Sequence, residues 1–150
     1  MSLQTTIKDG IKDAMKNKDM ARLTTLRGLS SAMMNEAVAQ NLGPQGELSD
    51  DQVIAVLMRE AKRRKDSIAQ YNEAGRDDLA GDERAELSVI EEFLPKMMSQ
   101  DEIRPLAEAK IAEMGADKSK AGMVTGALMK DLKGKADGND VKAVVDSLLA

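Results

Sequence analysis

Two residue types that often act in catalysis or metal binding, Cys and His, are absent from the sequence of 150 residues. Thiolates and imidazoles are the usual zinc ligands, and imidazole is the side chain that ordinarily titrates near neutral pH. Disulfides, Fe–S clusters, thiolate zinc sites and Ser-His-Asp catalysis are therefore excluded, and we expect no bound metal or cofactor.

Carboxylates remain as candidates for acid–base catalysis, and the sequence carries 26 Asp and Glu residues. Adjacent pairs occur at Asp77–Asp78 and at Glu91–Glu92. Neighbouring positions of a helix do not share a face, so neither pair is arranged to act on one substrate. Because no spacing organises the carboxylates, lysines and hydroxyls, we favour a protein that binds a partner over one that catalyses a reaction alone.

Lysines near the C-terminus form the clearest candidate binding site. The whole chain has a net charge of −4, but residues 118–150 carry six Lys and four Asp. Lysine side chains and unbonded backbone N–H groups beside a glycine can receive phosphates. This predicts a nucleic-acid-binding surface, and an ordinary solvated helix face is the alternative. The candidate residues are Lys120, Lys130, Lys133, Gly134, Lys135 and Lys142.

Two glycines precede these lysines, Gly122 and Gly126, one helical turn apart. Glycines at this spacing can open a groove in which a second helix packs closely, which is one interpretation of the segment. Phosphate binding around Gly134 is the other interpretation. The segment is not a nucleotide-binding loop, because the P-loop ending Gly-Lys-Ser/Thr is absent.

A second run of cations, Lys62–Lys65, lies within a predicted helix. At 100° per residue, four consecutive side chains wrap around the helix axis, so one of them must face inward. The apolar stripe places Arg64 or Lys65 on the core side, with its charge directed outward. An anion-binding patch is the functional interpretation. A solvated helix partly neutralised by Glu60 and Asp66 is the interpretation we favour.

The elements that position these residues are all helical. Apolar residues recur every three or four positions, and no long two-residue alternation suggests a strand. We therefore predict an all-α protein with helices at about 3–16, 19–37, 49–75, 77–94, 99–115, 120–130 and 141–148. A Pro and a new helix start coincide between residues 93 and 99. This predicts an N-terminal helical bundle at 1–95 and a small C-terminal three-helix domain at 99–150.

Local signals predict where several helices begin. Ser49 and Ser99 are each followed three residues later by Gln or Glu, which is the spacing of a capping box. Asp77 is expected to cap the helix that follows the glycine at 75. Pro105 lies too deep for a first turn, so we expect a kink or a later start of the helix at 99–115.

The remaining composition bears on the class of partner and on location. One Phe, one Tyr and no Trp leave no aromatic platform for base stacking, and 11 Met suit adaptable protein contacts. The N-terminus lacks the apolar core of a secretory signal, and no window approaches the ~20 apolar residues of a membrane span. We therefore expect a cytoplasmic protein with no membrane partner.

Three segments resemble the YqeY-like family of small bacterial proteins. They are KRRKDSIAQYNEAGRDDL at 62–79, EEFLPKMMS at 91–99 and GALMKDLKGKADGNDVKAVVDSLL at 126–149. The family is similar to the C-terminal tail domain of the B subunit of the glutamine-dependent aspartyl/glutamyl-tRNA amidotransferase. The resemblance implies an α-helical fold in two parts.

The resemblance also implies a function. In the amidotransferase the tail domain helps to hold tRNA, and the amide-forming chemistry lies in other domains. A tRNA-binding or tRNA-enzyme accessory module is implied, and a label of glutamine-dependent carbon–nitrogen ligase activity would be inherited from the longer enzyme. The shared C-terminal motif falls on Lys130, Lys133, Gly134, Lys135 and Ala136.

The chain departs from the tail-domain pattern in its charge. Asp137-Gly138 stands where the tail domain tends to have Asn-Pro, and Asp131 and Asp140 dilute the basic surface. Two hypotheses follow. The partner is tRNA or a tRNA-modifying or aminoacylation enzyme, or else the chain is a helical protein-interaction adaptor that binds no nucleic acid, which the acidic net charge and the missing aromatics favour.

Overall fold

The computed structural model describes residues 1–150 and is helical throughout, without strands. The predicted all-α fold is confirmed. The order is α1 (Leu3–Lys16), α2 (Met20–Ala39), α3 (Asp50–Glu73), α4 (Asp77–Phe93), α5 (Gln100–Met114), the 3₁₀ helix η1 (Lys118–Lys120), α6 (Ala121–Asp131) and α7 (Gly138–Leu149). The chain divides into two compact units, Met1–Leu94 and Pro95–Ala150, and each has its own core.

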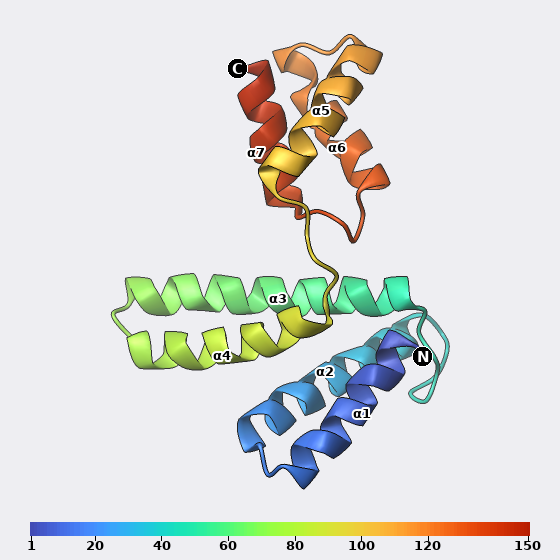
Figure 1. Cartoon of the computed structure of the whole chain (residues 1–150), viewed down its shortest axis with the longest axis vertical. Helices are drawn as coiled ribbons and strands as arrows, with labels where there is room; N and C mark the ends of the chain where they lie inside the picture. The colour runs from blue at the N-terminus through green and yellow to red at the C-terminus, as the bar shows by residue number, and fades with distance from the viewer. The chain divides into compact units, whose positions relative to one another are not determined.

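The first unit consists of two helical hairpins (Figure 1). Helices α1 and α2 form one hairpin, and α3 and α4 run side by side in the other. Apolar side chains from all four helices meet in one aliphatic core, whose fully buried members include Ile7, Leu26, Leu29, Leu57 and Ile90. This burial is the main contribution to stability, because apolar surface is removed from water.

Local interactions determine where helix α3 begins and ends. Ser49 Oγ accepts a hydrogen bond from the Gln52 N–H at 3.2 Å, and Gln52 Oε1 accepts one from the Ser49 N–H at 2.8 Å. This is the predicted capping box, and it is confirmed. The helix stops before Gly75, whose φ of 71° a residue with a side chain rarely adopts. The predicted cap at Asp77 is wrong, because α4 starts with Asp77 inside its first turn and Arg76 before it.

A buried amide ties α1 to the loop before α3. Gln4 is buried, and its Oε1 accepts a hydrogen bond from the Leu48 N–H at 2.8 Å. Leu48 is itself buried in the core. The Gln4 side chain therefore satisfies a backbone group that would otherwise be shut away from water without a partner.

The second unit is a three-helix bundle of α5, α6 and α7 (Figure 1). Its core is also aliphatic and contains the fully buried Ile103, Ala107, Val124, Val141 and Val145. Ser99 Oγ accepts from the Glu102 N–H at 3.2 Å, but Glu102 Oε1 bonds to the Ser99 hydroxyl and not to the Ser99 N–H, so only the first half of the predicted capping box is present. The expected later start at Pro105 is wrong, because α5 begins at Gln100 and continues through Pro105. Pro105 has no N–H and cannot donate the helical hydrogen bond to the Asp101 carbonyl, but the helix continues through it.

No helix of either unit is long and apolar enough to cross a membrane.

Replacing Gln4 by Ala should lower the free energy of unfolding by about 1–3 kcal/mol, because the buried Leu48 N–H loses its acceptor. Urea unfolding followed by circular dichroism measures this change. The matched control is Gln45→Ala in the same loop, where the side chain is exposed and a change within about 0.5 kcal/mol is expected. Equal losses in the two variants would show that the buried hydrogen bond does not stabilise the loop.

Candidate nucleic-acid interface

Helix α6 has one face that no other part of its unit covers. Val124 and Leu128 are buried in the core, whereas Gly122, Gly126 and Lys130 are exposed on the other side. A Cβ atom added at either glycine would meet no atom within 4 Å. No helix of the chain therefore packs closely against these glycines, and the close-packing interpretation has no support within the chain. The glycines leave the α6 backbone open to solvent.

A tight turn after α6 fixes the lysines that follow. Gly134 has a φ of 78°, in the left-handed region that favours glycine. The Lys135 and Ala136 N–H groups both donate to the Leu132 carbonyl, at 2.8 and 3.1 Å. Ala136 is fully buried. The turn is therefore anchored by backbone hydrogen bonds and by the core, and it presents Lys133 and Lys135 to solvent.

Two backbone donors at this turn have no partner in the chain. The N–H groups of Lys133 and Gly134 make no hydrogen bond, while those of the residues around them do. Consecutive unbonded N–H groups in a turn are a common arrangement for receiving an anion. The free donors lie beside the Lys133 and Lys135 side chains.

The lysines of this turn also have no acidic partner. Lys130, Lys133 and Lys135 form no ion pair, and all three are exposed. The nearest acid in sequence, Asp131, instead pairs with Lys110 of α5 at 3.2 Å. That carboxylate raises the pKa of Lys110, but Lys110 also pairs with Glu113 at 3.5 Å, so Asp131 shares this one cation with a second acid. The expectation that Asp131 dilutes the basic surface stays a prediction.

The structure groups four of the six candidate residues and separates the other two. Lys130, Lys133, Gly134 and Lys135 lie together at the end of α6, and we call this set the α6 basic end. Lys120 lies at the opposite end of the helix, about 15 Å away along the axis at 1.5 Å per residue. Lys142 lies on α7 and pairs with Asp146 at 2.7 Å. The charge of Lys142 is therefore partly neutralised by Asp146.

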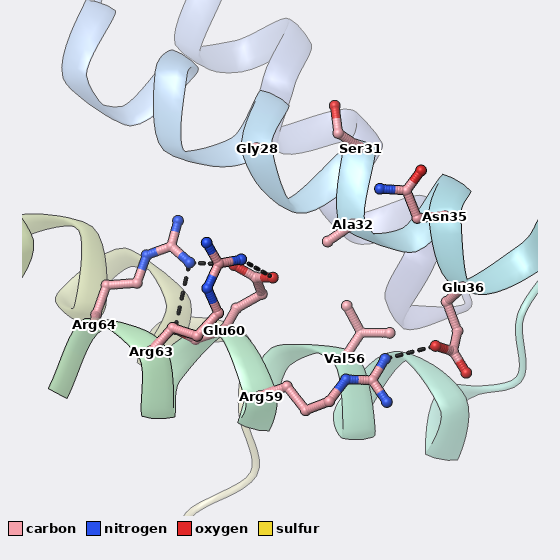
Figure 2. A pocket seen from close by; sticks show the side chains of 10 residues that line it. All are labelled: Gly28, Ser31, Ala32, Asn35, Glu36, Val56, Arg59, Glu60, Arg63 and Arg64. Atoms are coloured by element: carbon pink, nitrogen blue, oxygen red, sulfur yellow. Dashed lines mark hydrogen bonds and ion pairs between the residues drawn. The ribbon is translucent and has the colours of Figure 1, made fainter. Parts of the chain in front are cut away.

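A polar pocket of about 450 Å³ in the first unit was not anticipated from the sequence. It lies between α2 and α3, and Figure 2 shows Asn35 on the α2 side and Arg59, Arg63 and Arg64 on the α3 side. The lining residues come from two segments about thirty positions apart, so no local sequence motif predicts the pocket. The only signal is that Arg59 and Arg63 lie one turn apart, on one side of the helix.

Ion pairs organise the arginines of this pocket. Arg59 pairs with Glu36 at 2.6 Å, and Arg63 pairs with Glu60 at 3.2 Å. Arg64 is only 14% exposed and pairs with both Glu60 and Glu86. It is the member of the Lys62–Lys65 run that faces inward, as predicted, but its charge is neutralised by two carboxylates and does not reach outward. No group of three or more Asp and Glu side chains is placed to hold a metal ion.

Comparison with known proteins identifies the family. The family model described as Yqey-like protein matches residues 4–149. The chain belongs to the YqeY-like family.

Relatives of this YqeY-like chain occur in fungi. It is 30% identical over 135 residues to "Altered inheritance of mitochondria protein 41, mitochondrial" of Vanderwaltozyma polyspora, covering 89% of this chain and 68% of that protein. The protein with the same name from Pyrenophora tritici-repentis is 25% identical over 128 residues, with 84% and 68% covered. An uncharacterized protein of Schizosaccharomyces pombe is 30% identical over 98 residues, with 65% and 76% covered.

These relatives correct two expectations. They are eukaryotic proteins, so the description of the family as bacterial is wrong. Several are named as mitochondrial, which contradicts the predicted cytoplasmic location. The overall composition of a chain does not identify its cellular compartment.

Two glycine variants test the geometry of the interface. Gly126→Ala should raise the free energy of unfolding by about 0.5–1 kcal/mol, because Ala favours the helix and the site is open. Gly134→Ala should lower it by about 1–2 kcal/mol, because its left-handed backbone is strained with a Cβ. Chemical denaturation measures both values. A destabilising Gly126→Ala would mean that the glycine face is covered after all.

The ion pairs of the pocket predict a pH response. Two hydrogen bonds hold the pKa of Glu36 below its ordinary value, the larger contribution from Gln40 and the smaller from Arg59. The stability from this group is therefore present above its unfolded pKa and is lost as the pH falls through its folded pKa. Arg59→Gln should move the Glu36 pKa upward in a carbon-detected NMR titration. Arg63→Gln should leave that pKa unchanged, and an equal shift in both variants would contradict the assignment.

Proposed function

We propose that this chain is a non-catalytic RNA-binding accessory module that contacts tRNA through the α6 basic end. The observation that carries the proposal is the combination at that site. Three lysines without an ion pair, Lys130, Lys133 and Lys135, lie beside the two unbonded N–H groups of Lys133 and Gly134. A phosphate could accept hydrogen bonds from both kinds of donor at once.

The bare α6 face supports the same partner. Because Gly122 and Gly126 carry no side chain, a sugar–phosphate backbone can approach the helix more closely than it could past larger residues. Residues 95–150 contain no Phe, Tyr or Trp, so unstacked bases have no aromatic surface to bind. The contact would therefore be made to backbone phosphates and to the shape of a folded RNA.

The family relationship supports tRNA as the RNA. The resemblance to the tail domain of the tRNA amidotransferase rests on the segment that contains the α6 basic end. We find no group of residues suited to amide transfer near this segment. We therefore assign carbon–nitrogen ligase activity to the longer amidotransferase and not to this chain. The fungal relatives are named as mitochondrial, which makes mitochondrial tRNA one of the RNAs to test.

A second candidate function, a protein-interaction adaptor, is favoured by a different observation. Met34, Val38 and Leu42 are 44%, 52% and 46% exposed and follow one another at intervals of four residues on and just after α2. Exposed apolar side chains at this spacing are suited to contact with another helix.

Fluorescence anisotropy with labelled tRNA across a salt series tests the proposed function. The wild-type chain should bind with an affinity that falls as salt rises, because phosphate contacts release counterions. Changing Lys130, Lys133 and Lys135 to Glu should weaken binding at least about tenfold and reduce the slope of log affinity against log salt by about 2. The matched control changes Lys8, Lys12 and Lys62, which are exposed in the first unit, to Glu.

The control distinguishes a site from general attraction, because both triple variants alter the net charge equally. Loss of binding only in the Lys130, Lys133 and Lys135 variant supports the α6 basic end. Equal losses in the two variants would reduce the effect to net charge. No binding by the wild-type chain at low salt would overturn RNA binding and leave the adaptor hypothesis.

A further inference from the structure

The polar pocket between α2 and α3, called here the α2–α3 pocket, plays no part in the RNA-binding proposal. Its α2 wall carries the small residues Gly28 and Ala32, which leave room, and Asn35 at the rim. A Cβ added at Gly28 would meet nothing within 4 Å. The opposite wall is formed by the arginines of α3 (Figure 2).

Two of these arginines retain donors for a ligand. A guanidinium has five N–H donors. Arg59 uses Nη2 to reach Glu36, and Arg63 uses Nη1 to reach Glu60. Their side chains remain 60% and 75% exposed. Arg64, in contrast, is mostly buried and held by Glu60 and Glu86, so it stabilises the wall and is not available.

The ion pairs also hold the donors in place. Glu36 is only 16% exposed, accepts hydrogen bonds from Gln40 and Arg59, and thereby orients the Arg59 guanidinium. Glu60 does the same for Arg63. Donors that are already oriented lose less conformational entropy when a ligand binds.

The charge of the lining selects the charge of the ligand. Arg59, Arg63 and Arg64 pair with Glu36, Glu60 and Glu86, so the charges of this wall balance. Without net positive charge the wall cannot hold a dianion against Glu36 and Glu60, and it favours a ligand of low charge that is bound by directed hydrogen bonds from Arg59 and Arg63. Asn35 makes no hydrogen bond in the chain, so its amide can bind a polar group adjacent to the anion.

We propose that the α2–α3 pocket binds a singly charged carboxylate with an amide-like polar group beside it, as in a small N-acylated amino acid or the C-terminus of a peptide. The carboxylate would accept hydrogen bonds from Arg59 and Arg63, whose planar guanidinium groups match its geometry. The adjacent polar group would bind Asn35.

NMR on the whole chain tests this proposal with N-acetylglycine as the probe. The Nε–H signals of Arg59 and Arg63 and the side-chain amide signals of Asn35 should shift and saturate. N-acetylglycinamide, which lacks the charge, should not shift them, and dimethyl phosphate should bind more weakly. Acetylated tetraglycine separates the two sources, because it binds more tightly than N-acetylglycine if a peptide terminus is preferred and more weakly if a small acid is.

Three variants connect the signals to the pocket. Arg63→Gln should weaken binding about tenfold or more, because it removes hydrogen bonds to a charged group while Arg64 still holds Glu60. Gly28→Leu should abolish binding by filling the space, with every charge retained. The matched control is Lys62→Gln, which removes an adjacent exposed cation outside the pocket and should change affinity less than about twofold.

Several results would overturn the proposal. The pocket is no carboxylate site if dimethyl phosphate or N-acetylglycinamide binds as tightly as N-acetylglycine, or if no signal moves. Shifts of equal size at Arg22, Arg76 and Arg84 would show general ionic attraction. An equal effect of Lys62→Gln and Arg63→Gln would show the same. The amide spectrum of each variant establishes that it is folded, and Gly28→Leu tests the site without removing any ion pair.

Discussion

With one Phe, one Tyr and no Trp, the chain fills both of its cores mainly with aliphatic side chains. The stripe of each helix that enters a core determines which residues of that helix remain on the surface. Burial of Val124 and Leu128 turns Gly122, Gly126 and Lys130 toward solvent. Each helix can bury only one stripe, because its side chains repeat every 3.6 residues. The exposed face of α6 is therefore a consequence of core packing.

The two units differ in how they use their positive charge. In the first unit, Arg59, Arg63 and Arg64 are each paired with a glutamate, so their positions are fixed and their net charge is small. In the second unit, Lys133 and Lys135 are unpaired and lie on a backbone turn. Paired arginines suit a small ligand that needs oriented donors, whereas unpaired lysines suit a polyanion that needs accessible charge.

Local signals in the sequence predicted much of the fold because local interactions determine it. The capping box at Ser49 and the helix starting at Ser99 depend on groups three residues apart, and both were predicted correctly. The inward position of Arg64 followed from the apolar stripe. The cap at Asp77 was misplaced because Asp is favourable both as a cap and in the first turn, where it faces the positive end of the helix dipole.

The candidate sites were less predictable because they depend on which helices meet. The spacing of Gly122 and Gly126 fits a packed helix pair as well as an open face, and only the tertiary structure decides between them. The α2–α3 pocket is formed by residues about thirty positions apart, with no motif in either segment. The pairing of Asp131 with Lys110 likewise joins two helices, so neither segment alone could predict it.

The central claim is that RNA contacts the α6 basic end, and the most direct test is to map the contact residue by residue. Unlabelled tRNA added to the isotope-labelled chain should broaden or shift the backbone amide signals of Gly122, Gly126, Lys133 and Gly134 first. The unbonded Lys133 and Gly134 N–H signals should move downfield as they gain an acceptor. Changes centred on Arg59 and Arg63 of the first unit, or no changes at all, would contradict the account.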